Sequence, residues 1–448
     1  MIKSFKINKL FGVYNIHIPF FDETTFFNNS ISQQVQILVS ENGYGKTTIL
    51  NILYHLLNLD FTKLVNIDFD SVELIFTKNS EENIVLKKDL IIKRVQLIDD
   101  NLPYEFYEFE DNIKRLKYNS EEKDFDITEN RRESKDILEF FLKKRISKNF
   151  YRSSNAKKVI DDYHAIIEKI GNSINNYKLL NFPTYRRIEK SIHLDKNVSR
   201  DQIPFLHFGM GDVQKGLDDV TNEIIKSSFN QFSKVSGSIL TQLLGEVDAE
   251  ISSSQISEKE ISIILGRLGD NIKDTEKSKI INLVKTGEIF KPNHKQLLQF
   301  VFNLSSIYKE QEKYDKAIHN FVNICNKYLT NKVFIYNESE AKVSIIHKVN
   351  NRTLDLENLS SGEKQIISIF AYLYLFNIDT NNIILFFDEP ELSISIEWQK
   401  DLLVDILSTG KCKFIFATTH SPFIFANDDL SKYTVDLSEF IEIIDSKQ

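Results

Sequence analysis

The chain has 448 residues, a formal net charge of −8 at pH 7 and only 14 glycines. This length suffices for two or three lobes around a sizeable core, and the acidic balance excludes a surface that is basic throughout, so any nucleic-acid contact must be local. The low glycine content favours helix-rich lobes around a sheet.

The cysteines and the first residues bear on the compartment. Cys325 and Cys412 lie in different segments without the spacing of metal ligands, which predicts two reduced, buried and unreactive thiols. The chain opens directly on the strand-like residues 2–7, and no apolar run approaches about 18 residues. We therefore expect a cytoplasmic protein without a membrane-spanning segment.

The first chemical motif follows an apolar run at residues 35–39, which predicts a buried strand. Residues 40–48 read Ser-Glu-Asn-Gly-Tyr-Gly-Lys-Thr-Thr, and apolar residues at helical spacing continue to Leu57. A strand, a glycine-containing loop and a helix are the context of a phosphate-binding loop, although Ser40 replaces the first glycine of the usual pattern. The alternative is a glycine-rich turn that only caps an ordinary helix, because such a turn has a similar sequence pattern.

In a phosphate-binding loop these residues have distinct roles. Gly43 and Gly45 allow strained dihedrals that turn backbone N–H groups and the positive helix end toward phosphates. Lys46 is expected to reach the β- and γ-phosphates, and the Thr47 hydroxyl to ligate Mg²⁺. The expected nucleotide-binding residues of this loop are Asn42, Gly43, Gly45, Lys46, Thr47 and Thr48.

The middle of the chain reads as mostly helical and charged. Residues 101–178 lack sustained heptads, which favours an inserted helical arm over a long coiled coil. Residues 179–187 predict a strand that returns to the sheet and ends in Arg186 and Arg187, which could reach a nucleotide or a partner, or only pair with carboxylates. A second helical segment covers roughly residues 215–330.

A basic segment lies inside the first helical region. No acidic residue occurs between Glu139 and Asp161. The segment could bind a phosphate backbone or an acidic protein surface, or it is a solvated helix face with a few buried aromatic residues. Its basic residues are Lys143, Lys144, Arg145, Lys148, Arg152, Lys157 and Lys158.

A Ser-Gly motif precedes an apolar helix near the end of the chain. Residues 359–365 read Leu-Ser-Ser-Gly-Glu-Lys-Gln. Ser360, Ser361 and Gly362 thus place hydroxyls and backbone N–H groups at a positive helix end. The same residues are also consistent with a purely local role, in which a serine is the N-cap of the helix and Glu363 completes a capping box.

Two more buried strands are predicted at residues 382–387 and 413–419. Asp388 and Glu389 follow the first, and His420 follows the second. Ligands of open α/β sheets bind at the carboxyl ends of the strands. There Asp388 would hold Mg²⁺ through water, and Glu389 would orient or deprotonate the attacking water. Taken singly, such residues are more often ordinary strand ends.

The joint order of these four motifs resembles the ABC-class ATPases of the SMC, RecF and OLD (overcoming-lysogenization-defect) group. In that group the Ser-Gly motif is the signature, which binds the γ-phosphate of a nucleotide held by another subunit. The resemblance implies ATP and Mg²⁺ as cofactors, catalytic roles for Lys46, Glu389 and His420, and a switch-histidine contact from His420 to the γ-phosphate. The implied signature residues are Ser360, Ser361, Gly362 and Glu363.

Three segments narrow the resemblance further. Residues 388–399, 183–189 and 208–213 are similar to stretches of prokaryotic anti-phage defence ATPases, the AriA ATPases of PARIS and the PtuA ATPases of Septu or retron systems. Ser395 stands where such proteins commonly carry histidine, so no role of that histidine is implied here. The resemblance implies oligomers that hold a separate nuclease or toxin subunit and release or activate it upon infection.

We thus predict an α/β fold, a P-loop ABC-type ATPase head with a mixed or parallel sheet, flanking helices and an inserted helical arm. The expected segments are a nucleotide-binding lobe (1–100), a helical insert (101–178), a return strand and loop (179–214), a helical lobe (215–330) and a C-terminal ATPase lobe (331–448).

The expected function is that of an ATP-hydrolysing sensor and scaffold subunit of a two-component anti-phage system. The sequence shows no metal-nuclease motif, and few residues follow His420, so the effector is expected to be a separate protein. The other expected partners are further copies of the chain, which share composite ATP sites, and DNA or an acidic viral protein as trigger. The alternative is a RecF- or SMC-like ATPase in DNA repair or chromosome handling; a transporter subunit fits less well.

Overall fold

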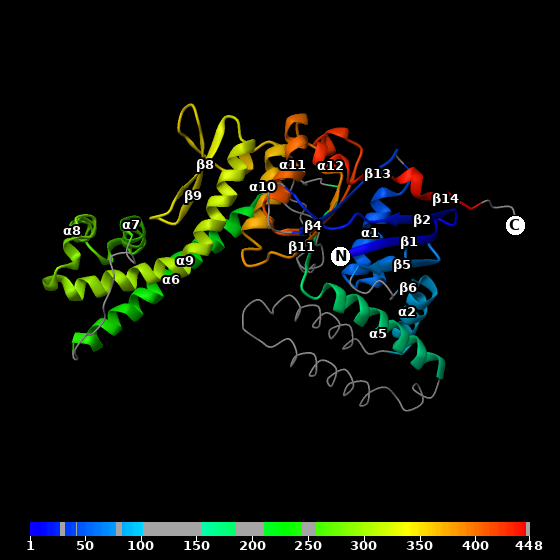
Figure 1. Ribbon diagram of the computed structural model, residues 1–448, viewed down its shortest axis with the longest axis horizontal. Helices are drawn as coiled ribbons and strands as arrows, with labels where there is room; N and C mark the ends of the chain where they lie inside the picture. Colours follow the sequence, from blue (N-terminus) through cyan, green and yellow to red (C-terminus); the bar gives the residue numbers. More distant parts are fainter. Residues whose placement is uncertain are drawn as a thin grey trace.

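The computed structural model describes residues 1–26, 32–41, 43–77, 83–101, 154–184, 210–243 and 257–444. Over these residues the chain forms a head of two main sheets with flanking helices, from which a pair of long helices projects (Figure 1). The predicted α/β class, with mixed sheets and flanking helices, is confirmed.

The larger sheet has the strand order β13-β4-β12-β11-β7, and all neighbours in that order are parallel. β4, β11 and β12 are buried along nearly their whole length, as expected for parallel strands covered on both faces. Because they are parallel, their carboxyl ends meet at one edge. The strands are β4 (Ser32–Val39), β7 (Lys178–Phe182), β11 (Ile383–Asp388), β12 (Cys412–Thr419) and β13 (Thr434–Asp436), with β3 (Thr24–Thr25) pairing antiparallel to β4.

The second sheet is antiparallel, with the strand order β14-β2-β1-β5-β6. In β5 and β6 every second residue is buried, which is the period of a sheet with one covered face. The strands are β1 (Ile2–Leu10), β2 (Tyr14–Pro19), β5 (Ser71–Phe76), β6 (Asn83–Lys87) and β14 (Ile441–Ile443).

Two hydrophobic cores lie on the two faces of the parallel sheet. In β11, Ile384 and Phe386 point into one core, whereas Leu385 and Phe387 point into the other. The first core is covered by α1 (Lys46–Leu57), α2 (Lys88–Asn101) and α5 (Ser154–Ile174), and the second by α10 (Ser361–Tyr374), α11 (Ile396–Ser408) and α12 (Asp428–Ser431). Helices α1 and α10 therefore lie on opposite faces of this sheet.

The projecting arm consists of the long helices α6 (Gly211–Leu243) and α9 (Lys295–Tyr328), with two shorter helices near its far end (Figure 1). These are α7 (Glu258–Arg267) and α8 (Asp274–Lys285), and they enclose a third core with α9. An antiparallel sheet of β8 (Lys332–Asn337), β9 (Lys342–His347) and β10 (Thr353–Leu354) follows α9. Short 3-10 helices are η1 (Phe61–Leu64), η4 (Gly269–Asn271), η5 (Glu288–Phe290), η6 (Pro292–His294), η7 (Leu356–Asn358), η8 (Pro422–Phe425) and η9 (Leu437–Phe440).

Several sequence-based expectations fall partly outside the described residues. Of the helical insert expected at residues 101–178, the structure describes residue 101 and residues 154–178, where α5 packs against α1 and α2. The basic segment up to residue 153 lies outside the described residues, as do Arg186 and Arg187. The projecting arm is formed by the stretch that we expected as a helical lobe.

Both cysteines are free and buried, as predicted. Burial raises the pKa of Cys412 to about 12, which keeps its thiol protonated. No helix in the described parts of the chain is long and apolar enough to cross a membrane.

A buried ion pair joins α7 to α9. Arg267 Nη2 donates to Asp315 Oδ1 at 2.5 Å, and the two side chains are 0% and 3% exposed. Arg267 also donates from Nη1 to Gln311 Oε1 at 2.7 Å and from Nε to the carbonyl of Glu338 at 3.0 Å. The Tyr336 hydroxyl donates to the same aspartate, so that α7, α9 and β8 meet in one polar network.

Replacing Arg267 by Met should destabilise the arm by about 3–5 kcal/mol, because Asp315 would stay buried without its cation. Lys259→Met is the matched control on the same helix. Lys259 pairs with Glu338 from a side chain that is 73% exposed, and such surface pairs contribute about 1 kcal/mol or less. Hydrogen exchange of the α9 amides measures both changes; equal protection in the two variants would contradict this role of Arg267.

Candidate active site

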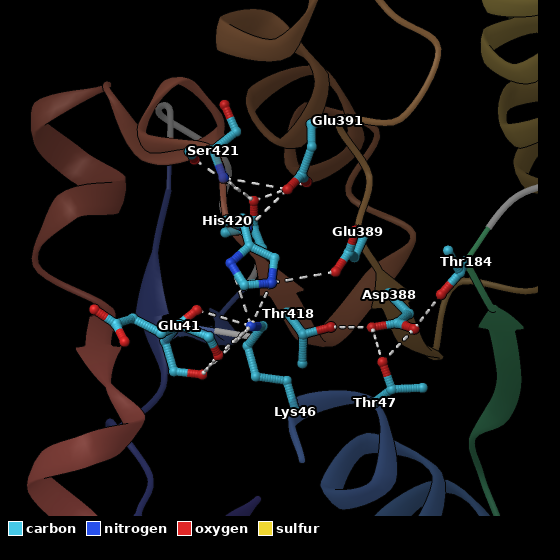
Figure 2. A network of polar contacts seen from close by, with 12 residues as sticks. Glu41, Lys46, Thr47, Thr184, Asp388, Glu389, Glu391, Thr418, His420 and Ser421 are labelled. Carbon is cyan, nitrogen blue, oxygen red and sulfur yellow. Dashed lines mark hydrogen bonds and ion pairs between the residues drawn. The ribbon is translucent and has the colours of Figure 1, made fainter. Parts of the chain in front are cut away.

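Polar side chains meet at the carboxyl edge of the parallel sheet (Figure 2). β4 leads into the predicted phosphate loop, β11 ends at Asp388 and is followed by Glu389, and His420 comes directly after β12. These three strands are adjacent in the sheet, which brings together parts of the chain that are far apart in sequence. The predicted residues found at this edge are Lys46, Thr47, Asp388, Glu389 and His420.

The loop between β4 and α1 has a backbone that suits an anion. Gly43 and Gly45 have φ angles of +97° and +80°, which glycine adopts readily. Gly45 is the N-cap of α1 and no side chain caps this helix, so its first N–H groups can donate to phosphate oxygens. Thr48 lies in the first turn of α1, and Asn42 lies outside the described residues.

Lys46 begins α1 and points along the sheet edge toward His420 (Figure 2). Its Nζ donates to the carbonyl of Ser40 at 2.8 Å and lies 2.6 Å from Nε2 of His420. An ammonium group can only donate, so the imidazole accepts through Nε2 in this contact. Burial lowers the pKa of Lys46, and three nearby carboxylates oppose that shift.

Asp388 is only 1% exposed and accepts hydrogen bonds from three threonine hydroxyls. Thr47 donates at 2.9 Å, Thr184 at 2.5 Å and Thr418 at 2.5 Å. These three donors come from α1, from the residues after β7 and from β12. They compensate the burial of the carboxylate and fix its orientation.

The contact between Thr47 and Asp388 fits a magnesium site. Mg²⁺ prefers oxygen ligands and keeps several waters when it binds together with phosphates. The Thr47 oxygen keeps lone pairs for a metal while its proton points at the carboxylate. Thr47 would therefore hold the ion directly, and Asp388 would hold it through water.

Glu389 is half-buried and has a φ angle of +48°, which is uncommon for a residue other than glycine. Its side chain points toward His420, with Oε1 at 3.5 Å from Nε2 (Figure 2). Burial raises the pKa of Glu389, the charges of Glu391 and Asp388 raise it further, and His420 and Lys46 oppose the shift. A raised pKa makes this carboxylate a better acceptor for a proton from water.

The Ser-Gly motif lies at the start of α10. Ser360 is the N-cap: its Oγ accepts from the Glu363 N–H, and the Glu363 carboxylate accepts from the Ser360 N–H at 2.7 Å. The capping box at the start of this helix is therefore present. Lys332 also donates to Glu363 at 2.6 Å, so this carboxylate is engaged within its own chain.

The other members of the motif differ in exposure. A Cβ at Gly362 would lie 2.5 Å from the carbonyl oxygen of Ser393, so a larger residue would displace the backbone. Ser360 and Ser361 are exposed. Of the four predicted signature residues, the two serines are the exposed ones, and the Ser360 hydroxyl oxygen also caps α10.

Sequence reasoning did not select Thr184, Thr418 or Glu391 for the site. The Glu391 carboxylate accepts from the backbone N–H of His420 at 2.8 Å. In the sequence, Glu391 could have been noticed because it lies two residues after Glu389. Thr418 lies near the end of β12, and Thr184 follows β7 in the same sheet. Each of these residues acts on a neighbour from another strand, which spacing along the chain does not reveal.

Comparison with known proteins identifies the family. Residues 1–425 match the AAA_15 family, which is described as an AAA ATPase domain. The chain belongs to this family. An AAA ATPase domain binds nucleotide, in agreement with the anion-binding loop and with the Thr47–Asp388 pair. A search of curated proteins finds no match to this chain.

Solved structures similar to this AAA ATPase domain include Smc heads. The Smc head domain with an extended coiled coil bound to the C-terminal domain of ScpA, from Pyrococcus furiosus, is 12% identical with a TM-score of 0.35, over 99% of this chain and 95% of that chain. The Smc head domain with a coiled coil and joint, from Pyrococcus yayanosii, is 11% identical with a TM-score of 0.30, over 99% of this chain and 96% of that chain.

With Glu389 as the proposed base, its raised pKa predicts that ATP hydrolysis is lost at a higher pH than an ordinary glutamate base would give. Above that pKa the carboxylate is ionised and can take a proton; as the pH falls through it, the base becomes protonated and kcat drops about tenfold per pH unit. We expect this fall to begin above the pH at which an ordinary glutamate titrates. The kcat at saturating ATP and Mg²⁺, measured from about pH 4 to 8 on protein shown to stay folded, tests this; a flat profile down to the ordinary glutamate range would contradict it.

Proposed function

We propose that the protein is an ABC-type ATPase that hydrolyses ATP at sites shared by two copies of the chain. The convergence of Lys46, Thr47, Asp388, Glu389 and His420 at one sheet edge carries this proposal (Figure 2). The set contains a cation for the phosphates, a hydroxyl and a carboxylate for Mg²⁺, a base with a raised pKa, and an imidazole between the cation and the base. These are the parts that phosphoryl transfer to water requires.

Each side chain has a role that follows from its position. The ammonium of Lys46 and the N–H groups at the start of α1 bind the phosphate oxygens. Glu389 orients the attacking water and accepts its proton, and His420 contacts the γ-phosphate beside it. Mg²⁺, when bound, would neutralise charge on the phosphates.

The separation of α1 and α10 supports a site shared by two chains. The phosphate loop begins α1 on one face of the parallel sheet, and Ser360 and Ser361 begin α10 on the other. The two serines are exposed at the positive end of α10, where Ser360 Oγ caps the helix and Ser361 lies in its first turn. A second copy that docks across the sheet edge could place them against the γ-phosphate.

For the cellular role, we favour a sensor and scaffold subunit of a two-component anti-phage system that controls a separate nuclease or toxin. The resemblance of residues 388–399, 183–189 and 208–213 to such ATPases supports it. The second candidate is an SMC- or RecF-like role in DNA repair or chromosome handling, which the projecting two-helix arm favours.

Native purification with mass spectrometry distinguishes the two roles. Co-purification with a small nuclease or toxin supports the defence role. Tight, length-dependent binding of duplex DNA with ATP-dependent release, and no such partner, supports the repair role. ATP hydrolysis itself is common to both and does not separate them.

The trigger of a defence ATPase could act on the basic segment. Reversing Lys143, Lys144, Arg145 and Lys148 to Glu should abolish the response to phage while basal ATP binding stays intact, and each lost phosphate contact should flatten the salt dependence of duplex binding by roughly 0.9 on a log–log plot. The matched control makes the same charge change at four exposed lysines of the head and the β8–β9–β10 sheet, Lys63, Lys87, Lys342 and Lys432. A normal phage response and wild-type DNA binding in the first variant would identify the segment as a solvated face.

A further inference from the structure

One carboxylate at the site is bonded to the backbone of the loop that carries His420. Glu391 Oε1 accepts from the N–H of His420 at 2.8 Å and from the N–H of Ser421 at 3.2 Å. Its Oε2 accepts from the Thr419 hydroxyl at 2.7 Å. Three consecutive residues at the end of β12 are thus bonded to a single side chain, and Figure 2 shows its contacts with His420 and Ser421.

Gln399 of α11 closes the same network from the other side. The Ser421 hydroxyl donates to Gln399 Oε1 at 2.6 Å. Gln399 Nε2 lies 3.2 Å from the carbonyl of Ile394 and 3.4 Å from that of Glu391. Since Gln399 is only 8% exposed, the loop and the turn that bears Glu391 are joined by contacts that solvent does not weaken.

The turn also fixes Glu391 relative to Glu389. The N–H of Leu392 donates to the carbonyl of Glu389 at 3.2 Å, and the N–H of Ile394 donates to that of Glu391 at 3.3 Å. The N–H of Glu389 donates to the carbonyl of Thr418 at 2.9 Å. These backbone hydrogen bonds therefore fix the position of Glu389, the candidate base, relative to the loop that carries His420.

The carboxylates of Asp388, Glu389 and Glu391 contact different groups at this edge of the sheet. Asp388 accepts from threonine hydroxyls, and Glu391 accepts from the histidine loop. The Glu389 carboxylate lies beside the imidazole of His420, with Oε1 3.5 Å from Nε2. Glu391 is thus occupied with the loop and is not placed to serve as the base.

We propose that Glu391 is a positioning residue that holds the imidazole of His420 between Lys46 and Glu389. It acts through the backbone of the loop, and not on the nucleotide or the water. The proposal rests on the proposed ATP hydrolysis for its effect on turnover, whereas the contact itself can be tested without turnover. A side chain displaced by about 1 Å can lower a rate by about 10²-fold, which sets the scale of the effect.

The kinetic test compares Glu391→Ala, Glu391→Gln and the matched control Glu397→Gln, an exposed carboxylate on α11. Glu391→Ala should lower kcat about 10- to 100-fold and leave the KM for ATP within about threefold. Glu391→Gln should retain part of the activity, because its amide oxygen still accepts from the loop. The control should behave as the wild type; wild-type kcat in Glu391→Ala would overturn the proposal.

A double-mutant cycle tests whether Glu391 acts through the histidine. In a His420→Ala background, Glu391→Ala should lower kcat by no more than about twofold further, because both changes remove the same positioned imidazole. If the effect of Glu391→Ala persisted in full without the imidazole, a positioning role through His420 would be wrong.

Hydrogen exchange of the full-length chain separates this proposal from the proposed function. The amides of His420 and Ser421 should exchange at least about tenfold faster in Glu391→Ala, while amides at the start of β12 stay protected as in the wild type and in Glu397→Gln. A wild type without ATP turnover would overturn the proposed function alone. Unchanged exchange at His420 and Ser421 would overturn the role of Glu391.

Discussion

Glu389→Gln should abolish ATP turnover and leave ATP binding close to that of the wild type. The substitution keeps the size of the side chain and its capacity to contact His420, but an amide cannot accept a proton from water. We expect kcat to fall by about 10²–10⁴-fold, the usual contribution of a general base. Hydrolysis rates together with the dissociation constant for ATP measure the two effects separately.

Two further variants make this result specific. Glu397→Gln removes an exposed carboxylate from α11 and should hydrolyse ATP as the wild type does. Lys46→Ala should instead weaken ATP binding, because its ammonium opposes the charge of the triphosphate. If Glu389→Gln retained wild-type turnover, Glu389 would not be the base.

Mixing Lys46→Ala protein with Ser361→Arg protein should restore ATP hydrolysis that neither shows alone. In a mixed dimer, one of the two sites combines the intact phosphate loop of one chain with the intact serines of the other. That site should work while its twin carries both defects, so activity should approach half the wild-type rate per mixed dimer. Hydrolysis as a function of mixing ratio, with mixed dimers demonstrated by mass, measures this.

The structure determines which signature residue suits this experiment. Ser361 is exposed, so an arginine there can extend into solvent without disturbing the fold. Gly362 is unsuitable, because a Cβ would meet the Ser393 carbonyl at 2.5 Å and unfolding would imitate loss of function. Lys46→Ala mixed with the double variant Lys46→Ala/Ser361→Arg is the control, and it should remain inactive. Mixed dimers of the first pair without activity would be incompatible with a shared site.

The parts of the site that the sequence predicts are those whose functional residues lie close together along the chain. The phosphate loop has its strand, glycines, lysine and helix in one stretch, so its local structure follows from local rules. The strands before Asp388 and His420 were recognisable as continuous apolar runs, because parallel strands are covered on both faces. Their meeting at one edge followed from the general placement of ligands in α/β sheets.

The parts that escaped prediction depend on contacts between distant segments. Thr184 and Glu391 gain their roles only when β7, β11 and β12 lie side by side, and the strand order is not encoded in any one of them. Glu363 stays a predicted signature residue, and the structure adds that its carboxylate is bonded to Ser360 and Lys332. A glutamate at this position can complete a capping box or belong to a nucleotide-binding signature. The sequence is the same in both cases, and only the surroundings of the helix end distinguish them.

The location of the arm also could not be read from the sequence. Residues 101–178 and 215–330 share a charged, helical pattern, and an amphipathic helix can cover a sheet or pair with another helix. The structure has α5 covering the head and α6 pairing with α9. Burial by partners that are far along the chain decides between these arrangements.

ATP hydrolysis between two copies of the chain requires the copies to associate when ATP is bound. The most direct test is the native mass of the Glu389→Gln variant with ATP and Mg²⁺, because this variant should hold ATP without consuming it. We expect complexes with an even number of chains and one ATP per chain, and we expect Ser361→Arg, added to the same variant, to disrupt them. A monomer that carries ATP at saturating nucleotide would contradict it.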